Sequence, residues 1–294
     1  MYTLHRILVC TDLSPPARHA AERAALVASS SGARLDVVHV MAQGWRERVQ
    51  AMVRGSPTDV GRQLDESIGR GLEELVRHLR DGRGVDVEGR TVDGPVVPTL
   101  AEEADRTAAD LIVLGARGAG YMRHALLGST AERVIRKARC PILVVRQRPH
   151  EAYRRALLAV DLSPVAQRVI EVGRVVAAGA RLMPLHAFHL QYEGKMQYAG
   201  VEESTIRRYR EAARADSAAR FDEVLRLAGM EHGLLAGLLT HGDPVTSILE
   251  QEQERDCDLV VLGKQGEGRF EELLLGSVTK HVLNESQADV LVAA

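Results

Sequence analysis

The chain is poor in aromatic residues and has almost no net charge, and both shortages argue against nucleic-acid binding. Phe, Trp and Tyr make up 3% of the 294 residues, so few side chains are available to stack on bases. The formal net charge of −2 at pH 7 gives no positive field to attract a phosphate backbone. The arginine cluster at 207–210 is interleaved with Glu202, Glu203 and Glu211, which indicates a solvated helix face. No nucleic-acid partner is therefore expected.

Cysteines and long apolar runs are also scarce. The three cysteines are Cys10, Cys140 and Cys257, and two of them lie in or beside predicted buried strands. Reduced thiols of a cytoplasmic protein are favoured over a disulfide framework. The apolar run near the N-terminus is short and soon reaches Asp12, which fits neither a signal peptide nor a membrane span. The sequence thus predicts a cytoplasmic protein with no membrane partner.

Several catalytic motifs are absent from the sequence. It contains no Gly-x-Gly-x-x-Gly dinucleotide fingerprint, no Gly-x4-Gly-Lys-[Ser/Thr] loop and no Gly-x-Ser-x-Gly elbow. The eleven histidines show no compact spacing of the zinc type. His39 and His186 occupy equivalent positions in two predicted strands, which favours a shared structural role such as anchoring a loop. We therefore expect no catalytic nucleophile and no dedicated metal site.

What the sequence does contain is a spaced pattern of small residues that occurs twice. The pattern Gly-x2-Gly-x9-Gly-Ser begins at Gly115 and again at Gly263, an offset of 148 residues (263 minus 115). Each copy follows an apolar run that predicts a buried strand and precedes a helical pattern. Glycine lets main-chain N–H groups approach an anion, and a helix N-terminus adds unpaired donors. Each copy therefore predicts an anion-binding loop, the alternative being a tight connection with no ligand.

The repeat extends through a complete half of the chain. The segment 6–15 is echoed by 156–164, which places Asp12 and Asp161 149 residues apart (161 minus 12). The alternative to a ligand contact is that these two aspartates only help the next helix to begin. In each half, apolar strands alternate with amphipathic helices, which is typical of a parallel sheet covered on both faces. We predict an α/β protein of two tandem Rossmann-like doubly wound domains, residues 1–148 and 149–294.

The expected strands place several segments at the ends or edges of the sheets. They are predicted at 5–11, 34–41, 85–92, 110–115 and 141–146, and at 155–160, 181–187, 233–240, 258–263 and 288–293. An unpaired apolar edge invites aggregation, so the last strands, 141–146 and 289–294, are expected to pair and to join the halves as a pseudo-dimer. The segments 42–57 and 188–200 have poor periodicity and are expected to be mobile surface loops.

These features resemble the universal stress protein family in its tandem, two-domain form. The resemblance rests on a first strand followed by Thr-Asp-x-Ser, a strand ending in His-Val, the glycine pattern, and a final Pro-x-Leu-Val-Val strand. It covers nearly the whole chain and occurs twice. It implies five-stranded parallel sheets of order 3-2-1-4-5 and an ATP site across the ends of strands 1, 2 and 4. Mg²⁺ bridging the phosphates is implied as well.

In the first half, the resemblance implies that Asp12 accepts a hydrogen bond from the nucleoside and that the main chain of Val40 meets the adenine edge. Arg117 and Arg123 would add positive charge, and Ala131 replaces a Ser or Thr that many nucleotide-binding relatives have. The implied nucleotide-binding residues of this half are Asp12, Val40, Gly115, Arg117, Gly118, Gly128, Ser129 and Thr130.

In the second half, the resemblance implies a matching site with a different charge. Gln265 stands where the first half has Arg117, and Glu267, Glu271 and Glu272 bring negative charge into the loop. Lys264, Arg269 and Lys280 are expected to offset this charge. The implied nucleotide-binding residues are Asp161, Ala187, Gly263, Gly266, Gly276, Ser277, Val278 and Thr279.

The leading hypothesis is a binding module that takes up ATP in one or both domains and acts as a nucleotide-dependent switch in the stress response. Its expected partners are an adenine nucleotide and an unidentified protein, and a homodimer is an alternative. A second hypothesis is an enzyme that hydrolyses ATP slowly or transfers its phosphoryl group. Such an enzyme needs an acid or base near the γ-phosphate, and neither glycine loop clearly supplies one. A third is a scaffold that binds no nucleotide, for which bulky residues should block the glycine path.

Overall fold

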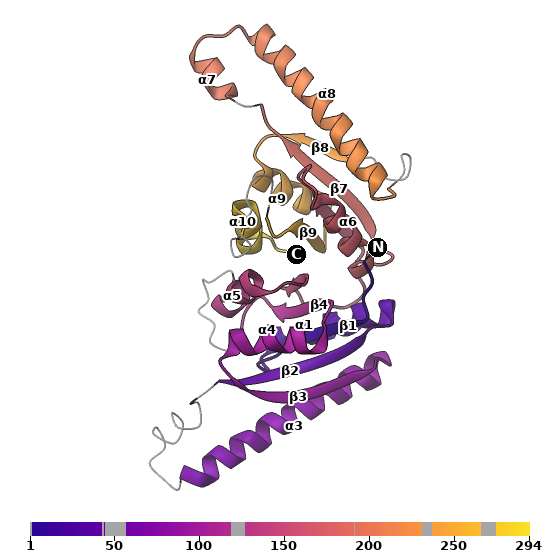
Figure 1. Cartoon of the computed structure of the whole chain (residues 1–294), viewed down its shortest axis with the longest axis vertical. Coiled ribbons are helices and arrows are strands. Elements are labelled where there is room, and N and C mark those ends of the chain that lie inside the picture. Colours follow the sequence, from indigo (N-terminus) through magenta and orange to yellow (C-terminus); the bar gives the residue numbers. More distant parts are fainter. Residues whose placement is uncertain are drawn as a thin grey trace.

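The computed structural model shows one continuous ten-stranded sheet with helices on both faces (Figure 1). It describes residues 2–42, 44, 57–118, 127–190, 192–230, 237–265 and 275–294. The long helices α3 and α8 lie at opposite ends of the molecule, and the two halves meet in the middle of the sheet. The described part of the chain is therefore an elongated α/β structure.

The first half alternates strands with helices, as the sequence predicts. Its elements are β1 (Arg6–Cys10), α1 (Pro15–Ser31), β2 (Arg34–Ala42), α3 (Pro57–Arg83), β3 (Val87–Gly94), α4 (Val96–Thr107), β4 (Leu111–Gly115), α5 (Ser129–Lys137) and β5 (Ile142–Val145). Most of the segment 42–57, predicted to be a mobile loop, lies outside the described residues.

The second half repeats this alternation. Its elements are β6 (Arg155–Ala159), α6 (Ala166–Val176), β7 (Arg181–Phe188), α7 (Glu193–Tyr198), α8 (Glu203–Leu227), β8 (Leu238–His241), α9 (Pro244–Glu254), β9 (Leu259–Gly263), α10 (Ser277–Glu285) and β10 (Asp289–Ala293). The prediction of a loop over 188–200 is wrong for its central part, which forms the short helix α7. Strand β8 begins at Leu238, and residues 231–236 lie outside the described part of the chain.

The strand order is β3-β2-β1-β4-β5 in the first half and β8-β7-β6-β9-β10 in the second, which is 3-2-1-4-5 in each. All pairs within a half are parallel. The halves join where β10 runs antiparallel to β5, with Leu291 opposite Leu143. The predicted pairing of the two last strands is confirmed, and it merges the two five-stranded sheets into one.

The hydrophobic core forms two layers, one on each face of the sheet. Side chains alternate across a strand, so Leu143 and Leu291 belong to one layer while Val144 and Val290 belong to the other. On the face that carries Leu143 and Leu291, helices α1 and α6 contact each other over the junction of β5 with β10. Because both layers run through the β5–β10 junction, the two halves share their core.

A buried polar cluster lies at one end of β10 and stabilises the junction between β5 and β10. The Asp289 carboxylate is fully buried and accepts hydrogen bonds from the Tyr153 hydroxyl (2.8 Å) and from the main-chain N–H of Arg146 (2.7 Å). The Arg23 guanidinium forms an ion pair with the same carboxylate at 3.2 Å and lies 4.0 Å from the centre of the Tyr153 ring. These residues come from α1, the linker and β10, so the cluster ties both halves to the segment between them.

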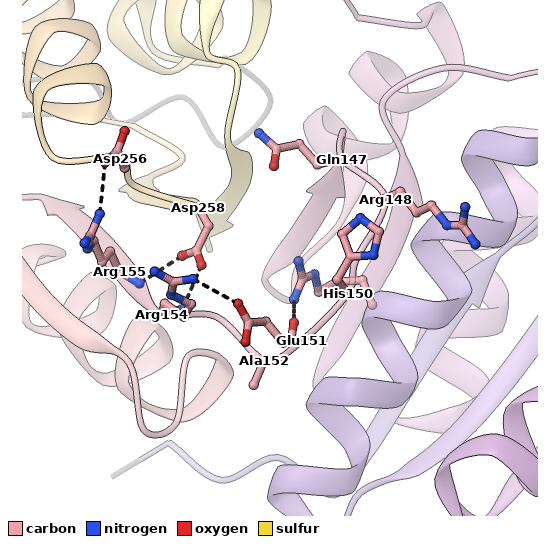
Figure 2. Close-up of a pocket in the computed structure, with 10 residues that line it drawn as sticks. Gln147, Arg148, His150, Glu151, Ala152, Arg154, Arg155, Asp256 and Asp258 are labelled. Carbon is pink, nitrogen blue, oxygen red and sulfur yellow. Dashed lines mark hydrogen bonds and ion pairs between the residues drawn. The ribbon is translucent and has the colours of Figure 1, made fainter.

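The linker between the halves borders a groove of about 420 Å³. Figure 2 shows that Arg155 points to Asp256 and that Arg154 lies beside Glu151 and Asp258. The ion pairs are Arg155 to Asp256 at 3.2 Å and Arg154 to Glu151 at 3.1 Å. These two arginines are thus engaged with acidic neighbours within the protein.

Candidate functional site

A cavity of about 650 Å³ opens at the carboxyl ends of the first-half strands. It lies where the strand order reverses, between β1 and β4, which is the position at which open α/β sheets bind ligands. All eight residues implied for the first half line it. The lining residues include Cys10, Asp12, Val38, Val40, Leu100, Gly115, Arg117, Gly118, Gly128, Ser129, Thr130, Ala131 and Glu132.

Asp12 follows β1 and shapes the entry to helix α1. Its Oδ1 accepts a hydrogen bond from the main-chain N–H of Ser14 (3.0 Å) and another from the Ser14 hydroxyl. These two hydrogen bonds shape the turn that leads into α1, as the interpretation of Asp12 as a helix-entry residue predicts. Leu13, next in the chain, has a φ of 61°, a left-handed conformation that is costly for a leucine.

Gly115 and Gly128 of the first loop stand where a side chain would press against main-chain atoms. A Cβ atom at Gly115 would lie 3.1 Å from the main-chain oxygen of Pro16. One at Gly128 would lie 3.3 Å from the main-chain oxygen of Ala116, which already accepts a hydrogen bond from the Gly128 N–H at 2.8 Å. The loop therefore packs tightly between β4 and the starts of α1 and α5.

Helix α5 begins at the wall of this cavity. Gly128 occupies its N-cap position and has no side chain with which to cap the first turn. The N–H groups of a first turn have no partners within the helix, and here that turn comprises the cavity-lining residues Ser129, Thr130 and Ala131. The helix start offers donors and a positive dipole end, which favours an anion.

The charged side chains of the first cavity have both signs. Arg117 lines it, whereas Arg123 lies outside the described residues. Glu132 also lines it, a feature that sequence analysis missed although the residue lies only three positions after Ser129, the end of the glycine pattern. Its carboxylate accepts a hydrogen bond from Arg136 at 2.8 Å. The ion pair with Arg136 reduces the negative charge that Glu132 brings to the helix start.

Cys10 lies in the cavity wall at the end of β1. Burial raises the pKa of its thiol to about 12. The thiol is therefore protonated at neutral pH, which is the unreactive form, because the thiolate is the nucleophile. Cys10 is thus an apolar wall residue of the cavity.

In the second half, the turn after β6 repeats the hydrogen bonds of the Asp12 turn. Asp161 Oδ1 accepts hydrogen bonds from the main-chain N–H of Ser163 (3.3 Å) and from its hydroxyl (2.6 Å). The other oxygen, Asp161 Oδ2, is buried and has no hydrogen-bond partner among the described residues. An orphaned carboxylate oxygen of this kind calls for a donor.

The remaining second-half residues surround the end of β9 and the start of α10. Thr279 donates its hydroxyl hydrogen bond to the main-chain oxygen of Gly263 at 2.8 Å, so this hydrogen stabilises the loop, a contact that sequence analysis missed. Gly276 is the N-cap of α10, Ser277 and Val278 form the first turn, and Ala187 lies near the end of β7. Gly266, together with Glu267, Arg269, Glu271 and Glu272, lies outside the described residues.

Lys264 does not place its charge in the second loop, as sequence analysis expected. Its Nζ donates hydrogen bonds to main-chain oxygens of the first half, Arg136 at 2.8 Å and Ala138 at 3.1 Å. The expectation is therefore wrong for this residue, because its long side chain reaches carbonyl groups at the end of α5.

The paired histidines have the structural role that their equivalent positions predict. His39 Nδ1 donates to the main-chain oxygen of Thr11 at 3.0 Å, and His186 Nδ1 donates to that of Val160 at 2.9 Å. Each ring thus fixes the residue that precedes Asp12 or Asp161. Within the described residues, no group of three or more His, Cys, Asp or Glu side chains is arranged to hold a metal ion. None of the described helices combines the length and the apolar character needed to cross a membrane.

Comparison with known proteins agrees with this architecture. A universal stress protein of Mycobacterium tuberculosis is 28% identical over 312 residues, covering 98% of this chain and 94% of its own length. One from Methanocaldococcus jannaschii is 31% identical over 142 residues, covering 48% of this chain and 82% of that protein. The crystal structure of a universal stress protein from Archaeoglobus fulgidus has a TM-score of 0.71 at 20% identity, covers 99% of both chains and shares the fold.

A comparison with models of protein families also detects the repeat. The sequence profile described as "Universal stress protein family" matches residues 3–146 and again residues 152–294. Together the two matches span almost the entire chain. The chain therefore belongs to the universal stress protein family, in its tandem form.

Proposed function

We propose that the chain binds ATP with Mg²⁺ in one or both halves and acts as a nucleotide-dependent switch in the stress response. The observation that carries the proposal is the 650 Å³ cavity at the reversal of the strand order. The glycine loop of Gly115, Gly118 and Gly128 and the start of α5 form part of its wall. The volume of the cavity lies within the range of about 300–1,000 Å³ that is common for small-molecule sites. The two binding units would be residues 1–148 and 149–294.

The lining of the first cavity divides into an apolar and a polar part, which suits a nucleoside phosphate. Val38, Val40 and Leu100 provide an apolar wall for the adenine ring. Asp12 Oδ2 would accept from a ribose hydroxyl. The phosphates would lie against the first turn of α5, where Ser129 and Thr130 offer N–H and hydroxyl donors.

The cavity also fits the requirement of Mg²⁺ for few protein ligands. Mg²⁺ bound with nucleotides takes most of its ligands from phosphates and water and only one or two from carboxylates. Among the lining residues, Asp12 and Glu132 carry carboxylates. Glu132 is the nearer of the two to the phosphate end, since it lies in the first turn of α5. When bound, the ion would neutralise phosphate charge, for which Arg117 is the one basic side chain among the described lining residues.

The second half supports the proposal through Asp161. Its buried Oδ2 lacks a hydrogen-bond donor among the described residues, and a ribose hydroxyl would supply one. Gly263, Gly276 and Ser277 repeat the glycine loop and helix start of the first half. A nucleotide in the second half would thus supply the donor that this oxygen of Asp161 lacks among the described residues.

Two measurements test the proposed function. The purified full-length chain is denatured, and released small molecules are identified by mass spectrometry. In parallel, nucleotide-free protein is titrated calorimetrically with ATP in the presence of Mg²⁺. We expect an adenine nucleotide in the extract or a saturable ATP isotherm with up to two sites per chain. Absence of both would refute the proposal and favour a scaffold that binds no nucleotide.

A further inference from the structure

Hydrogen bonds of Lys264 cross between the two halves and connect the end of α5 with the start of α10. The ammonium group of Lys264, which belongs to the second half, contacts the main-chain oxygens of Arg136 (2.8 Å) and Ala138 (3.1 Å). These two carbonyl groups lie at the carboxyl-terminal end of α5. The opposite end of the same helix forms the wall of the first cavity.

The main chain of Lys264 is built into the second candidate site. Lys264 directly follows Gly263, and its carbonyl oxygen accepts a hydrogen bond from the N–H of Gly276, the N-cap of α10, at 3.0 Å. Its own N–H donates to the main-chain oxygen of Ala293 at 2.8 Å. A single residue thus joins the start of the second-site helix to the end of the first-site helix.

Ala116 is the residue of the first half that is equivalent to Lys264, and the two differ in their side chains but not in their main-chain contacts. Its main chain makes the same two contacts, to Val145 and to Gly128, each at 2.8 Å. Its side chain is a buried methyl group, however, and cannot reach the other half. The lysine side chain is therefore not required for the local fold of a glycine loop of this type.

A cation at the carboxyl end of a helix has a clear physical effect. The last carbonyl groups of a helix lack partners within it, and the dipole places partial negative charge there. Helix α5 has nine residues, which corresponds to a length of about 13 Å. If so short a helix moves as one body, a displacement of its end at Arg136 and Ala138 would reach its start at Ser129.

A connection in the opposite direction comes from Arg146, which follows β5. Its guanidinium donates to the main-chain oxygen of Leu283, near the carboxyl end of α10. Its main-chain N–H donates to the buried Asp289 carboxylate at 2.7 Å. Each of the two short helices is thus held at its end by a cation from the other half.

We propose that Lys264 is a positioning residue for the first nucleotide site, contributed by the second half, and that it couples the occupancy of the two sites. This inference rests on the proposed function. Nucleotide bound at the start of α10 would shift Lys264, whose carbonyl oxygen accepts from Gly276, and with it the end of α5. By thermodynamic linkage, nucleotide at the first site would change the affinity of the second by the same factor.

The experiment compares the full-length chain with Lys264→Met and Lys264→Arg. A matched control is Lys137→Met, which removes an exposed lysine from the same end of α5. Hydrogen exchange of peptides from 115–118 with 127–137, and from 259–265 with 275–285, is followed during a titration with ATP and Mg²⁺. The two peptide sets report the two sites separately, and thermal melts establish that each variant is folded.

We expect Lys264→Met to change the affinity of the first site at least fivefold, the lower end of common coupling factors. Lys264→Arg, which keeps a cation at this position, should have a first-site affinity close to that of the wild type. Lys137→Met should leave the first-site affinity within twofold of the wild type. A second set of variants introduces Asp161→Ala into the wild type and into Lys264→Met. Asp161→Ala should change first-site affinity in the wild type and have no effect on it in Lys264→Met.

Equal first-site affinities in the wild type and Lys264→Met would overturn the inference, as would equal effects of Lys264→Met and Lys137→Met. Failure of the proposed function gives a different result, namely no protection of either peptide set by ATP in the wild type. In that case, amide hydrogen exchange of the 127–137 peptides in the ligand-free protein tests whether Lys264 positions α5. Faster exchange in Lys264→Met than in Lys137→Met supports it, and identical exchange refutes it.

Discussion

A Cβ atom at position 118 would lie 2.7 Å from Oδ2 of Asp12, which is closer than these atoms can approach. The loop after β4 therefore approaches the carboxylate after β1 so closely that a side chain at position 118 would force one of them to shift. Since Oδ1 of Asp12 is already hydrogen-bonded to Ser14, the carboxylate cannot turn away without losing that contact. The geometry of the first site depends on this pair.

We expect Gly118→Ala to weaken ATP binding at the first site about tenfold, equal to about 1.4 kcal/mol, because the methyl group displaces Asp12. Calorimetric titration with ATP and Mg²⁺ measures the effect. Gly69→Ala is the matched control, since a Cβ atom at position 69 on α3 meets nothing within 4 Å. Unchanged binding in a Gly118→Val, Gly266→Val double variant would contradict the site as a whole.

We expect ATP turnover slower than about 1 per second, which is below the ordinary range of enzymes. Phosphoryl transfer needs an aligned nucleophile and stabilisation of the developing charge. Among the described residues that line the first cavity, Asp12 and Glu132 carry the carboxylates, and each is engaged in a hydrogen bond, with Ser14 and Arg136 respectively. A steady-state phosphate-release assay checks this. Turnover at or above that rate would favour the enzyme hypothesis.

The junction cluster predicts a large stability effect at Asp289. Asp289→Asn places an amide where the carboxylate meets Arg23 and Tyr153, whose polar groups are buried with it. Breaking a buried ion pair by changing one partner costs about 3 kcal/mol or more. Urea unfolding of the full-length chain measures the loss. Asp256→Asn alters an exposed ion pair with Arg155 and should cost no more than about 1 kcal/mol. Similar losses in the two variants would show that the cluster does not stabilise the junction.

Glu103 gives a prediction for the pH dependence of stability. Hydrogen bonds from Arg106, and then from Arg90, lower the pKa of its carboxyl group. A lowered pKa in the folded state means that the stabilisation is complete above the ordinary glutamate pKa of about 4.3 and is lost as pH falls through the lower, folded value. The free energy of unfolding should therefore differ between wild type and Glu103→Gln at pH 7. The difference should be unchanged at pH 5 and should shrink below about pH 4; a constant difference down to pH 3 would contradict it.

The overall architecture could be predicted because its signals are repeated and periodic. Apolar runs such as 111–114 and 259–262 occur at one offset, and both became central strands next to the first strand of their half. The pairing of β5 with β10 followed from the apolar character of both last strands. Patterns of this kind act locally along the chain, so a sequence reveals them.

The contacts that were missed depend on long side chains and on distant parts of the chain. Helix α7 has only six residues and shows no apolar period. It is held by Glu193, which accepts hydrogen bonds from Arg210 on α8 and lies 3.0 Å from His241 Nε2 at the end of β8. The reach of Lys264 to α5 likewise crosses the junction of the halves. No spacing within one segment could indicate either contact.

The antiparallel pairing of β5 with β10 makes the union of the two halves independent of protein concentration. Two separate chains that paired along these strands would dissociate on dilution, because association follows mass action. Here a short linker keeps the partners in permanent proximity, which corresponds to an effective concentration of the order of millimolar. The chain therefore retains both halves as one unit even when only a few copies are present in a cell.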